Sequence, residues 1–210
     1  MPKGEGAIAW AYRTLPECQA VAGELDYCRE VRNLLQHNAK VGKSYLVEPS
    51  DGMIETILST IEKVTHPDLV SSIFVRKGDV RSAQMDDLVR PVMHEMAEKI
   101  YTHVPIVENN RVIGVFSENT LLSYLMSDTL VEIAEDATFA EFSDLLPLDA
   151  HESEVFGFIG INELAFTAAK RFREALKQKE RLGMLFVTAN GDPEEELLGI
   201  LTAWDMAAYF

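Results

Sequence analysis

The sequence has few cysteines, no long apolar run and little positive charge. Its two cysteines, Cys18 and Cys28, are too few for a disulfide framework and lack the spacing of metal ligands. No stretch approaches the roughly 20 apolar residues of a transmembrane helix, and the N-terminus lacks the basic-then-apolar order of a secretory signal. We therefore expect a cytoplasmic protein that neither spans a membrane nor holds a metal.

Positive charge is scarce, since the chain has 19 Lys and Arg residues but 34 Asp and Glu residues, which gives a formal net charge of −15. Such a surface repels phosphate backbones, which disfavours DNA and broad RNA binding. One small anionic ligand remains compatible with it, because salt screens charges beyond about 10 Å and N–H groups at a helix start attract anions. Hydrophobic residues are plentiful, at 47% of 210, which is enough for a real core.

Residues 1–67 have the periodicity of helices. Apolar residues recur at helical spacing over 25–35, and a second helix is expected after a cap at Ser50 or Asp51. That helix should end just before Pro67, because the residue before a proline avoids the helical conformation. We place a domain boundary there. The expected inward face of the second helix comprises Met53, Ile54, Ile57, Leu58, Ile61 and Val64.

After Pro67 one order of elements occurs twice, as a repeat. The first copy is expected to contain a strand at 70–75, a helix at 84–100, a hairpin turning at Asn109-Asn110 and a short helix at 118–126. The second is expected to contain a strand at 155–160, a helix at 162–178, strands at 184–187 and 197–201 around Asn190-Gly191, and a last helix from about Ala203. Leu176 is expected among the inward residues of the helix at 162–178, and those of the helix at 84–100 are expected to be Met85, Leu88, Val89, Val92, Met96 and Ile100. The chain is therefore predicted to have an α+β fold, with a helical segment at 1–67 and repeats at 68–128 and 129–210.

Each copy ends in a similar motif, Gly114-x-x-Ser117-x-x-Thr120 in the first and Gly199-x-x-Thr202-x-x-Asp205 in the second. The two glycines are 85 positions apart. A hydroxyl followed three residues later by an acid is also a capping box, which stabilises a helix start by about 1 kcal/mol. The second motif is thus compatible with a cap or with a ligand site.

This arrangement resembles the CBS domain, a β-α-β-β-α unit that occurs in tandem as the Bateman module. The resemblance covers residues 68–210 and includes His103 and Pro105 in the first hairpin. It implies a pseudo-two-fold pair of units that senses an adenosine-containing ligand, such as AMP, ADP, ATP or S-adenosylmethionine. It also implies a homodimer.

In the family this motif supplies a hydroxyl near the phosphate and a carboxylate for the ribose. The resemblance assigns these roles here to Thr202 and Asp205. A carboxylate can accept from two adjacent ribose hydroxyls at once. Gly199, without a side chain, would allow close approach of the backbone.

The first motif departs from the family, because Thr120 stands where the ribose carboxylate would be. We therefore expect one competent nucleotide site and a weakened or empty one around Ser117. Two aromatic residues each have two possible roles. His103 either lines the cleft or packs in the core, and Trp204 either stacks on an adenine or packs in the core.

The N-terminal segment contains Arg32, Asn33 and His37, which resemble the motif of the HEPN superfamily of helical proteins. The resemblance implies an RNase centre, in which the His moves a proton and the Arg stabilises the phosphate. RNA is an expected partner only if this centre is active. The same residues are also compatible with a solvated or dimer-facing helix surface without catalysis, and the whole chain with a dimerisation scaffold that binds no ligand. The sequence does not name the nucleotide or the downstream partner.

Overall fold

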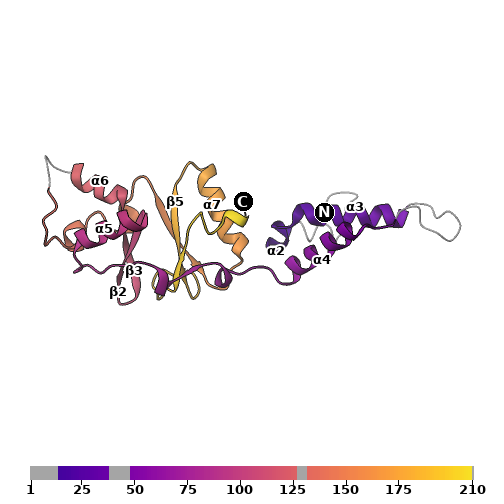
Figure 1. Cartoon of the computed structure of the whole chain (residues 1–210), viewed down its shortest axis with the longest axis horizontal. Coiled ribbons are helices and arrows are strands. Elements are labelled where there is room, and N and C mark those ends of the chain that lie inside the picture. The colour runs from indigo at the N-terminus through magenta and orange to yellow at the C-terminus, as the bar shows by residue number, and fades with distance from the viewer. Residues whose placement is uncertain (1–13, 38–47, 127–131, 210) are drawn as a thin grey trace. The chain divides into compact units, whose positions relative to one another are not determined.

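A computed structural model describes residues 14–37, 48–126 and 132–209 (Figure 1). The chain divides into two compact units, which are treated separately. The first contains the described residues up to Asp68 together with Leu164–Thr167 and Tyr209, and the second contains both repeats. Among the described residues, no helix combines the length and apolar character needed to cross a bilayer.

The first unit is a set of helices, α2 (Pro16–Gln19), α3 (Ala22–His37) and α4 (Asp51–Thr65). Helix α4 begins as predicted, with the Ser50 hydroxyl accepting a hydrogen bond from the Met53 N–H at 3.3 Å. Its apolar face is less covered than predicted, since Ile54, Leu58 and Ile61 are 45%, 60% and 53% exposed. In the described part of the chain α4 packs on α3. Because α3 covers only one side of α4, apolar residues on the rest of the α4 surface stay exposed.

The first repeat follows the predicted order with shorter elements. Its hairpin is confirmed, because Asn109 and Asn110 have φ values of 49° and 66° and connect the two strands in a two-residue turn. The predicted strand at 70–75 is mostly a 3-10 turn. The elements are η1 (Val70–Ser72), β1 (Val75–Arg76), η2 (Lys77–Asp79), α5 (Val89–Lys99), β2 (His103–Glu108), β3 (Arg111–Ser117) and α6 (Glu118–Met126).

For two residues of the first repeat's long helix, the predicted inward position is wrong. Leu88 precedes α5 and is 44% exposed, and Ile100 follows it with φ 60° and is 85% exposed. A left-handed residue ends a helix and turns the chain, so the apolar periodicity no longer applies there. Val89, Val92 and Met96 are buried as predicted.

The second repeat matches the predictions except at its end. No α-helix forms after Ala203 in the described residues; the chain makes turns and then a 3-10 helix, with a hydrogen bond from the Ala207 N–H to the Trp204 carbonyl at 3.2 Å. Leu176, predicted inward, is 71% exposed near the end of its helix. The elements are η3 (Phe139–Phe142), η4 (Leu148–Ala150), β4 (Val155–Gly160), α7 (Ala165–Lys177), β5 (Leu182–Thr188), β6 (Gly199–Leu201) and η5 (Ala207–Tyr209).

The strands form one sheet in the order β1-β6-β5-β4 and a two-stranded sheet, β2-β3. Strands β4 and β5 are parallel, with Phe158 opposite Phe186, because α7 carries the chain from the end of one to the start of the other. Strands β2 and β3 are antiparallel, as are β5 and β6. A core between the repeats joins β3 to β5, and its buried residues are Val112, Val115, Met184, Phe186 and Leu197.

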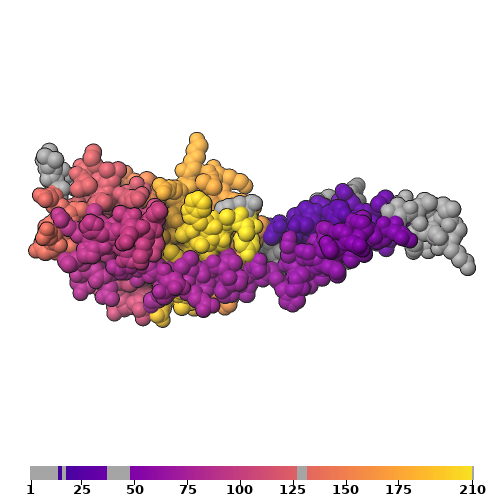
Figure 2. All heavy atoms as spheres, in the orientation of Figure 1, coloured from indigo at the N-terminus to yellow at the C-terminus, as the bar shows by residue number. Residues whose placement is uncertain are grey.

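Each repeat is completed by the opening segment of the other repeat. The first lead-in segment (residues 70–82) supplies β1, which pairs with β6 of the second repeat. In Figure 2 the yellow C-terminal residues lie beside the purple-to-magenta atoms of this segment. The second lead-in segment (residues 132–153) packs into the core of the first repeat through Ile133, Ala137, Phe139, Phe142 and Leu146. The repeats therefore share their cores by exchange.

The two motif glycines lie at these exchanges. A Cβ on Gly199 would overlap the carbonyl oxygen of Val75, and a Cβ on Gly114 would overlap that of Leu146. Each glycine thus allows close approach of the opposite lead-in segment.

Candidate functional site

The second motif forms a tight turn just after β6. The Thr202 N–H and the Thr202 hydroxyl each donate a hydrogen bond of 2.7 Å to Oδ2 of Asp205. The capping geometry expected for this residue pattern is therefore present. Both bonds use the same carboxylate oxygen, so Oδ1 is not part of this turn.

A cleft of about 290 Å³ lies beside this turn. It brings three of the predicted residues together: Thr202 and Trp204 from the second repeat and His103 from the first. Trp204 is 90% exposed, so its indole is not core packing. The other residues that line the cleft are Thr102, Phe172, Leu176, Arg181, Leu182, Gly183 and Ala203.

Two polar residues of this cleft were missed from the sequence. Thr102 and Arg181 immediately precede β2 and β5, and the structure places both at the cleft. A cation directly before a buried strand, in a chain with net charge −15, was an available signal for Arg181. A guanidinium is well suited to a phosphate or carboxylate.

The other predicted site residues lie elsewhere. Asp205 faces the turn, and Gly199 lies against Val75. Pro105 is buried in β2, where its carbonyl accepts a hydrogen bond from the Ala83 N–H at 3.0 Å. No ligand contact for these residues has been tested, so their binding roles stay predictions.

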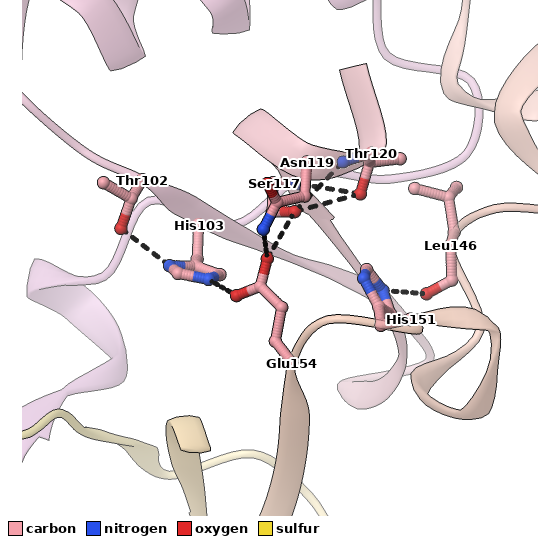
Figure 3. A network of polar contacts seen from close by, with 8 residues as sticks. All are labelled: Thr102, His103, Ser117, Asn119, Thr120, Leu146, His151 and Glu154. Atoms are coloured by element: carbon pink, nitrogen blue, oxygen red, sulfur yellow. Dashed lines mark hydrogen bonds and ion pairs between the residues drawn. The ribbon is translucent and has the colours of Figure 1, made fainter. Parts of the chain in front are cut away.

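Ser117 belongs to a buried polar network, here called the Glu154 network, made of Glu154, His103, Ser117, Asn119 and Thr120 (Figure 3). Glu154 directly follows the second lead-in segment and is only 2% exposed. Its Oε1 accepts hydrogen bonds from the Ser117 hydroxyl at 3.2 Å and from the Asn119 amide. Its Oε2 pairs with Nε2 of His103.

Burial by itself would raise the pKa of Glu154. The hydrogen bonds from His103, Asn119 and Ser117, with the charge of His103, outweigh burial and lower that pKa below its ordinary value. The carboxylate is therefore ionised near neutral pH. The Nδ1 of His103 lies 2.7 Å from the Thr102 hydroxyl, which orients the ring toward Glu154.

Within the network, Ser117 and Thr120 form the same turn as the second motif. The Ser117 N–H donates to the Thr120 hydroxyl at 3.0 Å, and the Thr120 N–H donates to the Ser117 hydroxyl at 3.2 Å. Both residues are buried. Thr120 thus replaces Asp205 in the turn but brings no charge.

A second histidine lies near the network. Nε2 of His151 is 3.4 Å from the Leu146 carbonyl oxygen, and its ring meets Phe156 edge-on at 4.9 Å. Burial lowers the pKa of His151. His151 also lines a separate cleft of about 470 Å³ next to Thr120 and Ser123.

The N-terminal motif is described only in part. In α3, Arg32 is exposed and donates a hydrogen bond of 3.0 Å to the Asn33 side-chain oxygen. Nothing in the described residues tests whether His37 joins them, so the RNase centre stays a prediction. Over the described ranges, no three His, Cys, Asp or Glu side chains gather as metal ligands would.

Residues 70–127 match the family model of the CBS domain. No curated protein matches the chain. A solved structure of a putative acetoin utilization protein (AcuB) from Vibrio cholerae is similar, with 20% identity and a TM-score of 0.48, over 67% of this chain and 87% of that one. The structure of CBSX2 in complex with AMP has 20% identity and a TM-score of 0.46, over 67% of this chain and 94% of that one. The CBS domain pair of MJ0100, in complex with 5′-methylthioadenosine and S-adenosyl-L-methionine, has 13% identity and a TM-score of 0.44, over 68% and 94%.

Proposed function

Residues 70–127 of this chain are a CBS domain, and we propose on that premise that the chain is a regulatory protein that binds an adenosine-containing ligand beside its second motif. The observation that carries the proposal is the cleft at which Thr202 and Trp204 meet His103. Its volume of about 290 Å³ suits a ligand of mononucleotide size, at the lower end of small-molecule pockets.

The lining of the cleft and the adjoining Thr202–Asp205 turn supply a complementary group for each part of a nucleotide. Arg181 is suited to the phosphate. The Thr202 hydroxyl would donate to the phosphate by exchanging its hydrogen bond to Asp205 for one to the ligand. The exposed indole of Trp204 offers a face for the adenine. The second carboxylate oxygen of Asp205, Oδ1, is suited to the ribose hydroxyls.

Regulation would follow from the position of the cleft between groups of both repeats. A ligand that contacts Thr202 and His103 together favours the arrangement of the repeats in which both are in reach. We expect the chain to act as a homodimer, through which such a change is passed to a partner.

The test is a thermal-shift panel on the full chain with AMP, ADP, ATP and S-adenosylmethionine. A ligand at 100 times its Kd stabilises the folded protein by about 2.7 kcal/mol, which raises Tm by several degrees. Trp204→Ala should abolish the shift, and Trp204→Phe, which keeps an aromatic face, should retain most of it. Because Trp204 is 90% exposed, neither change should affect folding.

Absence of any shift across the panel would reject an adenosine ligand. A shift that Trp204→Ala leaves intact would place the ligand elsewhere than in this cleft. Quenching of Trp204 fluorescence on titration with AMP is a second readout, with Trp204→Phe as the background.

A further inference from the structure

The first motif has no acid at the position of Asp205, and a carboxylate from outside the motif lies beside it. The Glu154 carboxylate lies where β3 ends and α6 begins, and it is held by Ser117, Asn119 and His103 (Figure 3). Its side chain is 1% exposed, and Ser117 is also 1% exposed. While this carboxylate is in place, a solute could not reach the Ser117 hydroxyl.

The donors around Glu154 are those that an anionic ligand would use. A hydroxyl, an amide and an imidazole converge on its two oxygens, at the start of a nine-residue helix. Helix starts favour negative charge, and hydrogen bonds to an ionised acceptor are stronger than those between neutral groups. The carboxylate therefore satisfies these donors as a ligand phosphate would.

Two further features agree with this arrangement, the residue at position 120 and the place of Glu154 in the chain. Thr120 stands where the second motif has Asp205, and a second carboxylate in this buried position would repel Glu154. Glu154 itself directly follows the second lead-in segment, which packs into the first repeat. The exchange of lead-in segments thus brings the carboxylate to the first motif.

We propose that Glu154 is a built-in occupant of the first repeat's ligand site, so that the pair of repeats takes a single nucleotide, at the second motif. The count of one nucleotide rests on the function proposed above. The occupation of the first site by Glu154 rests on the network alone.

The Glu154 network and the cleft beside the second motif have His103 in common. His103 lines the cleft of the second motif and also pairs with Glu154. A Cβ on Gly183, another lining residue, would lie 3.2 Å from Nε2 of His103 and 3.3 Å from Oε2 of Glu154. The network therefore lies directly behind the cleft, and the buried negative charge helps to hold His103 in its wall.

The test compares Glu154→Ala, which vacates the position, with Glu154→Gln, which fills it without charge. Inorganic phosphate is the probe, because Thr120 offers no carboxylate for a ribose. Isothermal titration of the full chain should show one more phosphate bound per chain in Glu154→Ala than in the wild type. Glu154→Gln should bind no more than the wild type.

A folded Glu154→Ala variant that binds no additional phosphate would overturn the proposal. Equal gains in Glu154→Ala and Glu154→Gln would also overturn it, because the gain would then come from the loss of one negative charge and not from the vacated position. A wild type that binds none of AMP, ADP, ATP and S-adenosylmethionine would reject the proposed function, and the phosphate comparison would still decide whether Glu154 occupies the first site.

If Glu154→Ala does not fold, the wild type itself provides the measurement. The ¹³C signal of the Glu154 carboxyl group should be unchanged when AMP, or failing that phosphate, is added to saturation. A shift of that signal to the position of a solvent-exposed carboxylate would show that Glu154 is displaced, and would overturn the proposal.

Discussion

The Ser117 hydroxyl donates a hydrogen bond of 3.2 Å to the Glu154 carboxylate, although the two residues are 37 positions apart. Ser117 ends the hairpin of the first repeat, and Glu154 precedes the first strand of the second. The bond therefore links the repeats by a buried charge next to their shared apolar core. Because a buried carboxylate is costly when it loses a donor, this contact is a sensitive point of the fold.

We predict that Ser117→Ala lowers the free energy of unfolding by about 2 kcal/mol, the range for a hydrogen bond to a charged group. The same change removes the acceptor of the Thr120 N–H. Urea unfolding of the wild type and the variant measures the difference.

Ser123→Ala is the matched control, because Ser123 is an exposed serine in the same helix, α6. It should change the stability by less than about 0.5 kcal/mol. Equal effects of the two substitutions would contradict a special role for the Ser117 hydroxyl.

The stability of the chain should depend on the ionisation of Glu154. Its pKa in the folded state lies below the ordinary value of 4.5, so its contribution is present above that value and is lost as the pH falls through the folded pKa. The wild type should therefore lose more stability than Glu154→Gln between about pH 5 and about pH 3. The urea concentration at the unfolding midpoint, measured across this pH range for both proteins, tests the prediction. The same pH dependence of stability in the two proteins would contradict it.

His151 should destabilise the fold in mild acid. Burial lowers its pKa below 6.5 in the folded state, so the unfolded chain takes up the proton more readily. Stability should fall as the pH drops below about 6.5, and His151→Gln should make the fall shallower. Thermal melts of both proteins between about pH 7 and about pH 5 measure it. Equal slopes in the wild type and in His151→Gln would contradict the prediction.

We predict that Gly199→Ala and Gly114→Ala each destabilise the second unit by about 3 kcal/mol, at the upper end of the cost of overpacking. In both, the new Cβ would overlap a backbone carbonyl of the opposite lead-in segment, which cannot move as a flexible side chain does. Chemical unfolding measures the loss.

Gly78→Ala is the control for both glycines, because no atom lies within 4 Å of the position of its Cβ. It should be neutral or slightly stabilising. If Gly199→Ala were equally harmless, the lead-in segment would not pack as closely as described.

Several local features were predictable because they depend on neighbours in sequence. The Asn109-Asn110 turn follows from two residues that tolerate positive φ between apolar runs. Helix α4 follows from its Ser50 cap and the proline after it. The missing helix after Ala203 could not be foreseen, because Asp205 caps a turn equally well whether an α-helix or a 3-10 helix follows.

The sequence by itself determined that the chain holds a repeated α+β unit and that only the second copy keeps an acid in its motif. The tertiary structure alone decided that the lead-in segments are exchanged, that Trp204 shares a cleft with His103, and that Glu154 lies against Ser117. The physical reason is that a buried charge is stable only where donors surround it. For Glu154 these donors come from distant parts of the chain, so no local pattern reveals them.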